Sequence, residues 1–390
     1  TPGTGAVSAV HLNKHVNFAL PQGASLPAAE KAKSLAQPTA LTFSPSGDTL
    51  YVAAFGSAKV AALPMSSLTA SGFESDASRH ITVPAGPAGL ALNASGSRLY
   101  VYSRIAHSVS VVDTAQRSVL STRNLFSPES TVVKTGRQFL YDANLSSANG
   151  SVSCASCHVF GDLDHLAWDL GNPDDATQLN PNAYVSNSPR TTPRFHPLKG
   201  PMTTQTLRGM RGNGPLHWRG DRTGTNRQTV RGAVETLEEA AFKEFNGAFI
   251  GLLGRETVLT AAQMQAFTDF AMRLAMPPNP IRALDGSLTT DEAAGRNIYL
   301  NVPTTLLGSC DNCHRLRPAE GKFGTAGLMS FEGGRISENF KVPQLRNMYQ
   351  KVGMFGFSGD ASAATGAQVR GFGFSNDGSL DTLENFFKDP

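Results

Sequence analysis

Leu41-Thr-Phe-Ser-Pro-Ser-Gly-Asp-Thr-Leu-Tyr-Val52 recurs, with changes, as Leu90-Ala-Leu-Asn-Ala-Ser-Gly-Ser-Arg-Leu-Tyr-Val101, so that Tyr51 and Tyr100 lie 49 residues apart. Each copy has the pattern of a strand, a Ser-Gly turn and a second strand. A further strand is expected after each copy, at residues 59–63 and 108–113. Residues 136–141, Gly-Arg-Gln-Phe-Leu-Tyr, form a fainter third copy.

Such a repeat, with several strands per unit, is typical of β-propeller blades. The copies resemble a YVTN-type propeller, and an unrelated β-meander is the alternative. Propellers close with about four to eight blades, whereas this chain has two clear copies and a weak third. Either blades are missing from the chain, or divergent strands near residues 11–20 complete a smaller structure. Because the chain stops in the helix-like segment 385–390, we expect it to be a fragment of a longer product.

All four cysteines belong to two copies of Cys-x-x-Cys-His, at residues 154–158 and 310–314. This motif is typical of covalent c-type haem attachment, in which two thiols bind the porphyrin and the histidine binds the iron. The alternatives are a disulfide within each motif, a redox Cys-x-x-Cys, or half of a zinc site. We see no βαβ unit of the thioredoxin type, and a four-cysteine zinc site needs no histidine after each pair. The sequence therefore predicts two haem c groups, held by Cys154, Cys157, His158, Cys310, Cys313 and His314.

After residue 151 the sequence is helical and rich in loops. Thr260-Ala-Ala-Gln263 has the form of a capping box and is followed by apolar residues at helical spacing. Pro277-Pro278 is expected to end that helix, and Thr289-Thr-Asp-Glu292 to begin another that leads into the second motif. We therefore expect a multidomain chain with N-terminal all-β propeller-like blades (1–150) and a mainly α, cytochrome c-like dihaem region. That region is divided into a first haem domain (151–285) and a second (286–390).

Composition excludes few classes of protein. The net charge of +3 over 390 residues is too small to indicate nucleic-acid binding. No run of 18 apolar residues predicts a transmembrane segment. Because c-type haem is attached outside the bacterial inner membrane, we expect a periplasmic or extracellular protein whose signal peptide is absent from this chain.

Residues 140–390 resemble the bacterial dihaem cytochrome c peroxidases, whose relatives include the maturation enzyme MauG and the haem-containing rubber oxygenases. The resemblance rests on the two haem motifs, 156 residues apart, and on weaker segments. These segments are Leu216-His-Trp-Arg-Gly-Asp-Arg222, Glu235-Thr-Leu-Glu-Glu-Ala240, Lys341-Val-Pro-Gln-Leu-Arg-Asn347 and Asn376-Asp-Gly-Ser-Leu-Asp-Thr-Leu-Glu384.

The resemblance implies that Trp218 lies between the two haems as an electron relay, with His217 beside it; a core or surface tryptophan is the alternative. The peroxidases also carry a distal glutamate that acts as acid and base. Counting along this chain from Trp218 to the position of that glutamate leads to Gly247-Ala-Phe-Ile250, which has no carboxylate. Glu244 is close in sequence but out of register. An apolar residue such as Phe249 is closer to the rubber-oxygenase pattern, in which O2 meets the iron in an apolar pocket.

The sequence offers several candidates for the second axial ligand of each haem. For the first haem they are His165, His196 and His217, and for the second they are Met329, Met348 and Met354. We favour His217, which adjoins Trp218, and Met354, which lies in a glycine-flanked loop. Met/His ligation would give an electron-transfer haem of raised potential. The alternatives are surface histidines and a core methionine.

Two further groups have polar side chains suited to ligands. Arg346 and Arg222 are candidates to pair with haem propionates, and surface ion pairs are the alternative. Asp162, Asp164 and Asp169 are candidate Ca2+ ligands, although a solvated acidic turn is favoured.

Three functions remain open at this level. The first is a dihaem oxidoreductase in which the haem at His314 takes electrons from a redox protein and the haem at His158 reduces peroxide or activates O2. The second is an electron carrier without catalysis. The third is a binding module whose propeller recruits a partner. The absence of a glutamate in register moves weight from the first to the second, whereas the segments that contain Leu-Arg-Asn and Thr-Leu-Glu keep the first open, so the carrier without catalysis is the alternative.

Overall fold

The computed structural model forms two compact units, residues 1–157 with 246–270, and residues 158–245 with 271–390. The predicted boundaries near 150 and 285 stay predictions. The residues that the structure describes are 9–17, 19–20, 24, 26–68, 72–170, 176, 178–179, 194–195, 201–280, 282–304, 308–320, 322–325, 327, 329–331, 339–352, 373–378 and 380–388.

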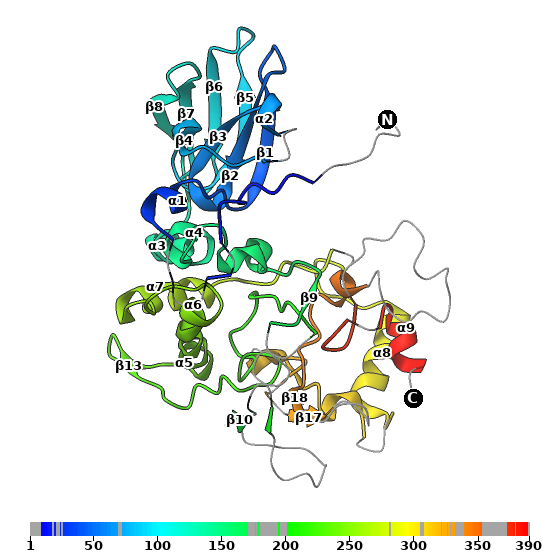
Figure 1. The fold of residues 1–390 in the computed structure, drawn as a ribbon. Helices are drawn as coiled ribbons and strands as arrows, with labels where there is room; N and C mark the ends of the chain where they lie inside the picture. Colours follow the sequence, from blue (N-terminus) through cyan, green and yellow to red (C-terminus); the bar gives the residue numbers. More distant parts are fainter. Residues whose placement is uncertain are drawn as a thin grey trace. The chain divides into compact units, whose positions relative to one another are not determined.

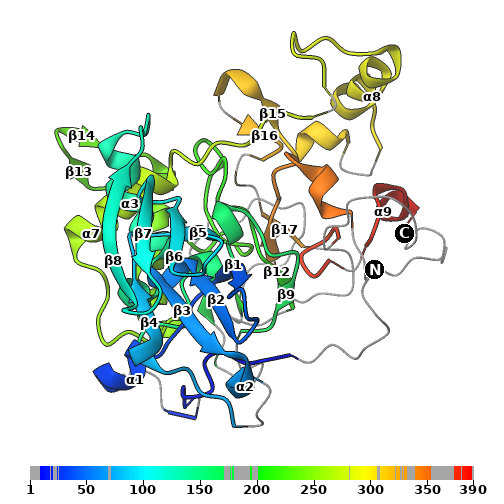
Figure 2. The same ribbon diagram turned by 90° about the horizontal axis from the view of Figure 1, so that it is seen from above.

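The first unit contains two four-stranded antiparallel sheets, each a meander of consecutive strands (Figures 1 and 2). We call the sheet β1–β4 the first blade and the sheet β5–β8 the second blade. Their strands are β1 (Pro38–Phe43), β2 (Thr49–Ala54), β3 (Lys59–Pro64), β4 (His80–Thr82), β5 (Pro87–Leu92), β6 (Arg98–Ser103), β7 (Ser108–Asp113) and β8 (Ser118–Asn124). The predicted three-strand units are confirmed, and each gains a fourth strand that the repeat did not indicate.

The hairpin turns of the two blades have the same geometry. Gly47 and Gly96 adopt φ values of +74° and +73°, where a residue with a side chain is strained. Their N–H groups donate to Ser44 O at 2.9 Å and to Asn93 O at 3.0 Å. The Ser-Gly turn predicted from the sequence is therefore built alike in both copies.

One core joins the two blades. Tyr51, on β2, is 6% exposed and belongs to a cluster that draws residues from both sheets, whereas Tyr100, at the same position of the repeat on β6, is 42% exposed. Face-to-face packing of four-stranded sheets is how propeller blades associate. The described residues hold two blades, and these do not close a ring. The buried cluster comprises Tyr51, Val60, Ala62, Ile81, Val83, Leu99, Val101 and Val112.

The predicted third copy of the repeat at residues 136–141 is wrong. These residues lie in helix α3 (Thr131–Tyr141), whose N-terminus is capped by Ser130 Oγ accepting from Val133 N. Phe139 and Leu140 are buried on this helix, so its apolar residues serve a helical face. The segment lacks the Ser-Gly turn of the other copies, and it therefore has no hairpin partner.

The other helices of the first unit are short, apart from α7 (Ala261–Ala271). The predicted capping box is confirmed: Thr260 N donates to Gln263 Oε1 at 2.9 Å and Gln263 N donates to Thr260 Oγ1 at 3.3 Å. The helix ends at Ala271, before the prolines expected to stop it. The short helices are α1 (Ala28–Ala32), α2 (Met65–Leu68), α4 (Ala143–Ser146) and α6 (Ala248–Gly251).

The second unit has helices α5 (Leu237–Lys243), α8 (Thr290–Asn301) and α9 (Leu383–Lys388) in its described part. The predicted start of α8 is confirmed by a capping box between Thr289 and Glu292. Five short antiparallel ladders accompany the helices, which the expectation of a mainly α region did not include. They pair β9 (Ala167–Trp168) with β12 (Met202–Thr203), β10 (Gln178–Leu179) with β11 (Arg194–Phe195), β13 (Thr229–Val230) with β14 (Ala233–Val234), β15 (Leu316–Arg317) with β16 (Lys322–Phe323), and β17 (Met329–Phe331) with β18 (Asn339–Lys341).

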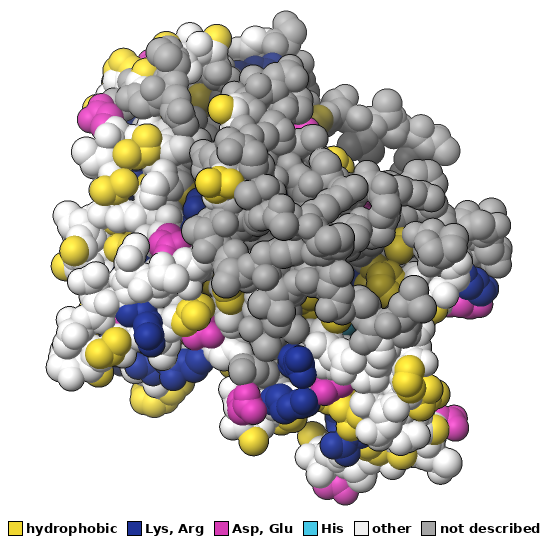
Figure 3. Space-filling model, turned by 90° about the horizontal axis from the view of Figure 1, so that it is seen from below, with side chains coloured by type: hydrophobic (Ala, Val, Ile, Leu, Met, Phe, Trp, Pro, Cys, Tyr) yellow, Lys and Arg dark blue, Asp and Glu magenta, His cyan; other side chains and the backbone are white. Residues whose placement is uncertain are grey.

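Within the described residues, no helix combines the length and the apolarity that crossing a membrane requires. On the face shown in Figure 3, described side chains of both charges lie among scattered hydrophobic ones.

Candidate haem sites

The first motif begins in a 3-10 turn, η3 (Cys154–Ser156). Ser153 N donates to Ser156 Oγ at 3.0 Å, and Cys157 N donates to Cys154 O at 3.3 Å. Side chains three residues apart lie on the same side of such a turn. Both thiols therefore leave the backbone in a similar direction, as attachment to one porphyrin edge requires.

Cys154 does not have the character of a redox-active thiol. All four cysteines are described, and none of them forms a disulfide. Burial raises the pKa of the Cys154 thiol to about 12. Reactive Cys-x-x-Cys pairs instead have a lowered thiol pKa. The chemistry of Cys154 argues against the redox alternative.

The second motif repeats the same local geometry. Its 3-10 turn, η6 (Cys310–Asn312), has Cys313 N donating to Cys310 O at 3.2 Å. Tyr299, on the preceding helix α8, donates its hydroxyl proton to His314 O. Helix α8 thus leads into the second motif, as predicted, and fixes the backbone of its histidine.

Each motif histidine is oriented by a main-chain carbonyl. His158 Nδ1 lies 2.8 Å from Gln205 O, and His314 Nδ1 lies 3.0 Å from Pro343 O. Because a carbonyl can only accept, Nδ1 carries the proton in both rings and Nε2 is left as the ligand atom. Burial lowers the pKa of both imidazoles, which favours the neutral form that binds iron. Histidines that bind metals are held in this way, so two thiols and one anchored imidazole per motif fit haem c.

Trp218 is 5% exposed and occupies a central place in the hydrogen bonds of the second unit. Its indole Nε1 donates to Thr203 O at 2.7 Å, and its carbonyl accepts from Lys341 N at 2.7 Å. Lys351 Nζ lies 5.7 Å from the centre of the indole ring, in a cation–π arrangement. The Trp218 side chain is therefore fixed from several sides.

His217 has the hydrogen-bond pattern of a ligand histidine. Its Nδ1 lies 2.6 Å from Asp221 Oδ1, which leaves Nε2 available, and its ring meets Phe245 edge to face. Burial alone would raise the pKa of Asp221, but the hydrogen bond from His217 and the charges of His217 and Arg222 hold that pKa below its ordinary value. The carboxylate orients the imidazole in the way that outer-sphere carboxylates orient metal ligands.

The other axial candidates are less well placed or lie outside the described residues. His165 is exposed, at a left-handed backbone position. Met348 is half-buried at the start of η8 (Met348–Lys351). The predicted ligand Met354, the candidate His196 and the side chain of Met329 lie outside the described residues.

Glu244 and Phe249, from the segment expected to carry a distal residue, each make structural contacts within their own unit. Glu244 accepts from Thr223 N at 3.1 Å and from Gly224 N at 2.9 Å, so its carboxylate holds a loop of the second unit. Phe249 is buried in the first unit, edge to face with Phe267. Neither arrangement provides a free carboxylate for acid–base work.

The remaining candidate ligands also have local partners. Asp162 pairs with Arg208 at 3.0 Å, and Asp164 accepts from Trp168 Nε1 at 2.8 Å. In the described part of the chain, no three His, Cys, Asp or Glu side chains gather as a metal site. Calcium binding stays a prediction without a site to support it.

The two arginines predicted to bind propionates differ in their surroundings. Arg222 pairs with Asp221 at 2.9 Å and its guanidinium lies over Phe245. Burial lowers the pKa of the half-buried Arg346. Arg222 is thus engaged within the protein, and a role for either arginine beside a propionate stays a prediction.

The residues that sequence reasoning missed are the carbonyl partners, Thr203, Gln205 and Pro343. They act through the main chain, which every residue type carries, so no residue pattern could have indicated Thr203 or Gln205. Pro343 lies in the Lys-x-Pro-x-Leu-Arg-Asn segment, and that segment was the one available signal.

Comparisons with known proteins identify no family for this chain, so the assignment of the haem sites depends on the residues described above. No protein-family model matches the sequence, and no curated protein matches it. Among solved structures, one hydrazine synthase chain from Kuenenia stuttgartiensis covers 67% of this chain and 79% of its own, at 20% identity and a TM-score of 0.39. Another is 25% identical, with a TM-score of 0.20, over 23% of this chain and 24% of its own. A periplasmic gluconolactonase from Pseudomonas aeruginosa is 20% identical, with a TM-score of 0.22, over 24% of this chain and 28% of its own. The last two matches therefore span about a quarter of those proteins, and at these TM-scores none of the three carries an argument about function.

Proposed function

We propose that this chain is an exported dihaem c-type cytochrome, periplasmic or extracellular, that moves electrons between two covalently attached haems. Cys154, Cys157 and His158 would hold the first, and Cys310, Cys313 and His314 the second. Bound haem supplies one-electron redox chemistry, whose potential depends on the axial ligands and on the polarity around the iron. The expected partner is a redox protein that donates electrons to the chain or accepts them from it.

One observation carries the proposal: four hydrogen bonds, linked by short stretches of main chain, form a path between the two motif histidines through Trp218. His158 bonds to Gln205, two residues from Thr203, which accepts from the Trp218 indole. Trp218 O accepts from Lys341 N, and Pro343, two residues further on, accepts from His314.

Every member of this path lies in the second unit. The path fixes both imidazoles against one framework and holds an indole between their anchors. Such an arrangement suits a relay residue, because a buried and rigidly held aromatic ring needs little rearrangement when an electron passes. A tryptophan that only filled the core would need no link to either histidine.

The alternative is that the first haem also performs catalysis on peroxide or O2. His217 favours it, because its free Nε2 and its bond to Asp221 suit a group that orients a ligand or transfers a proton. Glu244 disfavours a peroxidase mechanism, since its carboxylate is bound by two main-chain N–H groups. Electron transfer without catalysis is therefore the proposal, and a high-spin haem in the EPR spectrum would favour the catalytic alternative.

The proposal is tested by replacing each of the two tryptophans in turn. Trp218→Phe should slow electron transfer between the haems at least several-fold, as followed by stopped-flow absorption after partial reduction. Trp168→Phe is the matched control, because the Trp168 side chain is exposed and its indole bonds to Asp164, outside the path between the histidines. Equal rates in the two variants would contradict a relay role for Trp218.

A further inference from the structure

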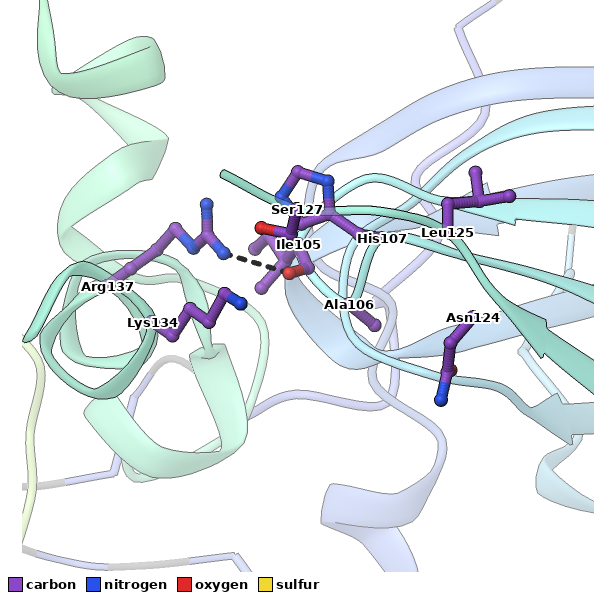
Figure 4. Close-up of a pocket in the computed structure, with 8 residues that line it drawn as sticks. All are labelled: Ile105, Ala106, His107, Asn124, Leu125, Ser127, Lys134 and Arg137. Carbon is purple, nitrogen blue, oxygen red and sulfur yellow. Dashed lines mark hydrogen bonds between the residues drawn. The ribbon is translucent and has the colours of Figure 1, made fainter. Parts of the chain in front are cut away.

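The first unit contains a pocket that the haem proposal does not use. Its volume is about 420 Å3, within the range of small-ligand sites. It lies where the turn between β6 and β7 and the end of β8 approach helix α3 (Figure 4). The lining residues are Ile105, Ala106, His107, Asn124, Leu125, Ser127, Lys134 and Arg137.

Arg137 supplies a buried donor to this pocket. Its Nη1 bonds to Glu129 Oε1 at 2.7 Å and its Nη2 to Ile105 O at 2.9 Å. Arg137 is 9% exposed, and its Nε is buried without a hydrogen-bond partner among the described residues. A buried N–H without an acceptor costs free energy that a bound acceptor would recover.

Lys134 supplies a charge that nothing nearby neutralises. It is exposed and lines the pocket one helical turn from Arg137, and its ammonium makes no ion pair or hydrogen bond among the described residues. The Arg137 charge is balanced by Glu129, which also accepts from His107 at 2.8 Å. Of the three charged side chains Arg137, Glu129 and Lys134, the first two balance each other, and the charge of Lys134 is left over.

The blade side of the pocket carries apolar side chains next to the polar Asn124. Ile105, Ala106 and Leu125 line it, and Figure 4 shows Leu125 and Asn124 on the blade side and Lys134 and Arg137 on the helix side. A ligand that satisfies both sides has an anionic head and a short apolar body. A single excess positive charge and one guanidinium nitrogen without a partner in the part of the chain that the structure describes, Nε, match a carboxylate better than a phosphate dianion, which would draw on a two-pronged arginine contact.

We propose that this pocket binds a small monocarboxylate with a short apolar body. The carboxylate accepts from Arg137 Nε and pairs with Lys134 Nζ, and the body packs against Ile105, Ala106 and Leu125. No residue of either Cys-x-x-Cys-His motif lines the pocket, so the site is distinct from both proposed haem sites.

The test is calorimetric titration of the haem-loaded protein with hexanoate. We expect saturable binding, weakened about tenfold by Lys134→Met, in line with the loss of one charge-assisted hydrogen bond. Arg117→Ala is the matched control, because Arg117 is exposed in the turn between β7 and β8, at the other end of β7 from the pocket. It should leave the affinity unchanged.

Two further arms keep the proposal falsifiable. Hexanamide, which has the same body without the charge, should bind at least tenfold more weakly than hexanoate. Glu129→Gln should tighten hexanoate binding, since it removes the anion that competes for Arg137. No hexanoate binding, equal affinities for hexanoate and hexanamide, or an equal effect of Lys134→Met and Arg117→Ala would overturn the proposal.

Discussion

Lys341 shows how one residue can organise a site without touching its ligand. Its N–H donates to Trp218 O at 2.7 Å, and its buried ammonium donates to Pro215 O at 2.7 Å. Both bonds hold the segment that carries Trp218. Two residues further on, Pro343 anchors His314. The cost is a buried charge, which lowers the pKa of Lys341 from 10.5 to about 8.

This shift predicts a pH dependence of stability. Between pH 8 and pH 10.5 the folded protein releases the Lys341 proton while the unfolded chain keeps it, so the free energy of unfolding rises with pH in that window. The rise should be on the order of 3 kcal/mol at most. Urea denaturation at pH 7 and pH 10 should show a smaller rise in Lys341→Met than in the parent. Lys388→Met, which removes an exposed lysine of the same unit, should keep the parent's rise; equal rises in Lys341→Met and the parent would contradict the assignment.

The haem-attachment residues could be predicted from the sequence because their chemistry resides in side chains at a fixed spacing. Their orientation could not be predicted, since it depends on the carbonyls of Gln205 and Pro343. Hydrogen bonds to the main chain leave no trace in residue type. The cofactor is therefore inferred from the Cys-x-x-Cys-His motifs in the sequence. The path between the two histidines could be found only in the three-dimensional structure.

At the scale of elements, the repeat correctly predicted the paired strands of each copy. It did not predict the fourth strand of each blade, and its third copy is wrong. Residues 41–52 and 90–101 form hairpins because each has alternating apolar residues around a glycine turn. The fourth strands, β4 and β8, escaped notice because β4 has three residues and β8 is largely exposed. Residues 136–141 have residue types in common with the repeat but lack its Ser-Gly turn. They lie instead in the helix that Ser130 caps.

The helix that replaced the predicted third copy depends on a close approach to α7. A Cβ added at Gly136 would lie 2.2 Å from Ala266 O and 2.4 Å from Phe270 Cβ. Alanine favours helices over glycine by about 1 kcal/mol, yet overpacking of this kind typically costs about 1–3 kcal/mol or more. Gly136→Ala should therefore lower the thermal unfolding midpoint measured by circular dichroism.

Gly295 on α8 offers the matched control. Apart from the backbone of α8 itself, no described atom lies within 4 Å of a Cβ added there, so only the helix propensity changes. Gly295→Ala should leave the midpoint unchanged or raise it slightly. A midpoint for Gly136→Ala at or above that of the parent would show that α3 and α7 do not pack as described.

At the scale of the whole molecule, two compact units carry two different kinds of order. The first has internal repetition, with one face of the first blade buried against the second and the equivalent Tyr100 face left exposed. The second has short ladders and loops arranged around two histidine anchors. We infer that the strand repeat provides a scaffold and a ligand pocket, while the second unit provides the path for electrons.

The central claim is that each Cys-x-x-Cys-His motif carries one covalently bound haem. Protein exported from a host that matures c-type cytochromes should be digested and its peptides identified by mass spectrometry. The account predicts one haem on the peptide with Cys154 and Cys157, and one on the peptide with Cys310 and Cys313. Replacing both cysteines of one motif by serine should remove only that motif's haem. Free thiols or a disulfide at either motif in the parent protein would contradict the account.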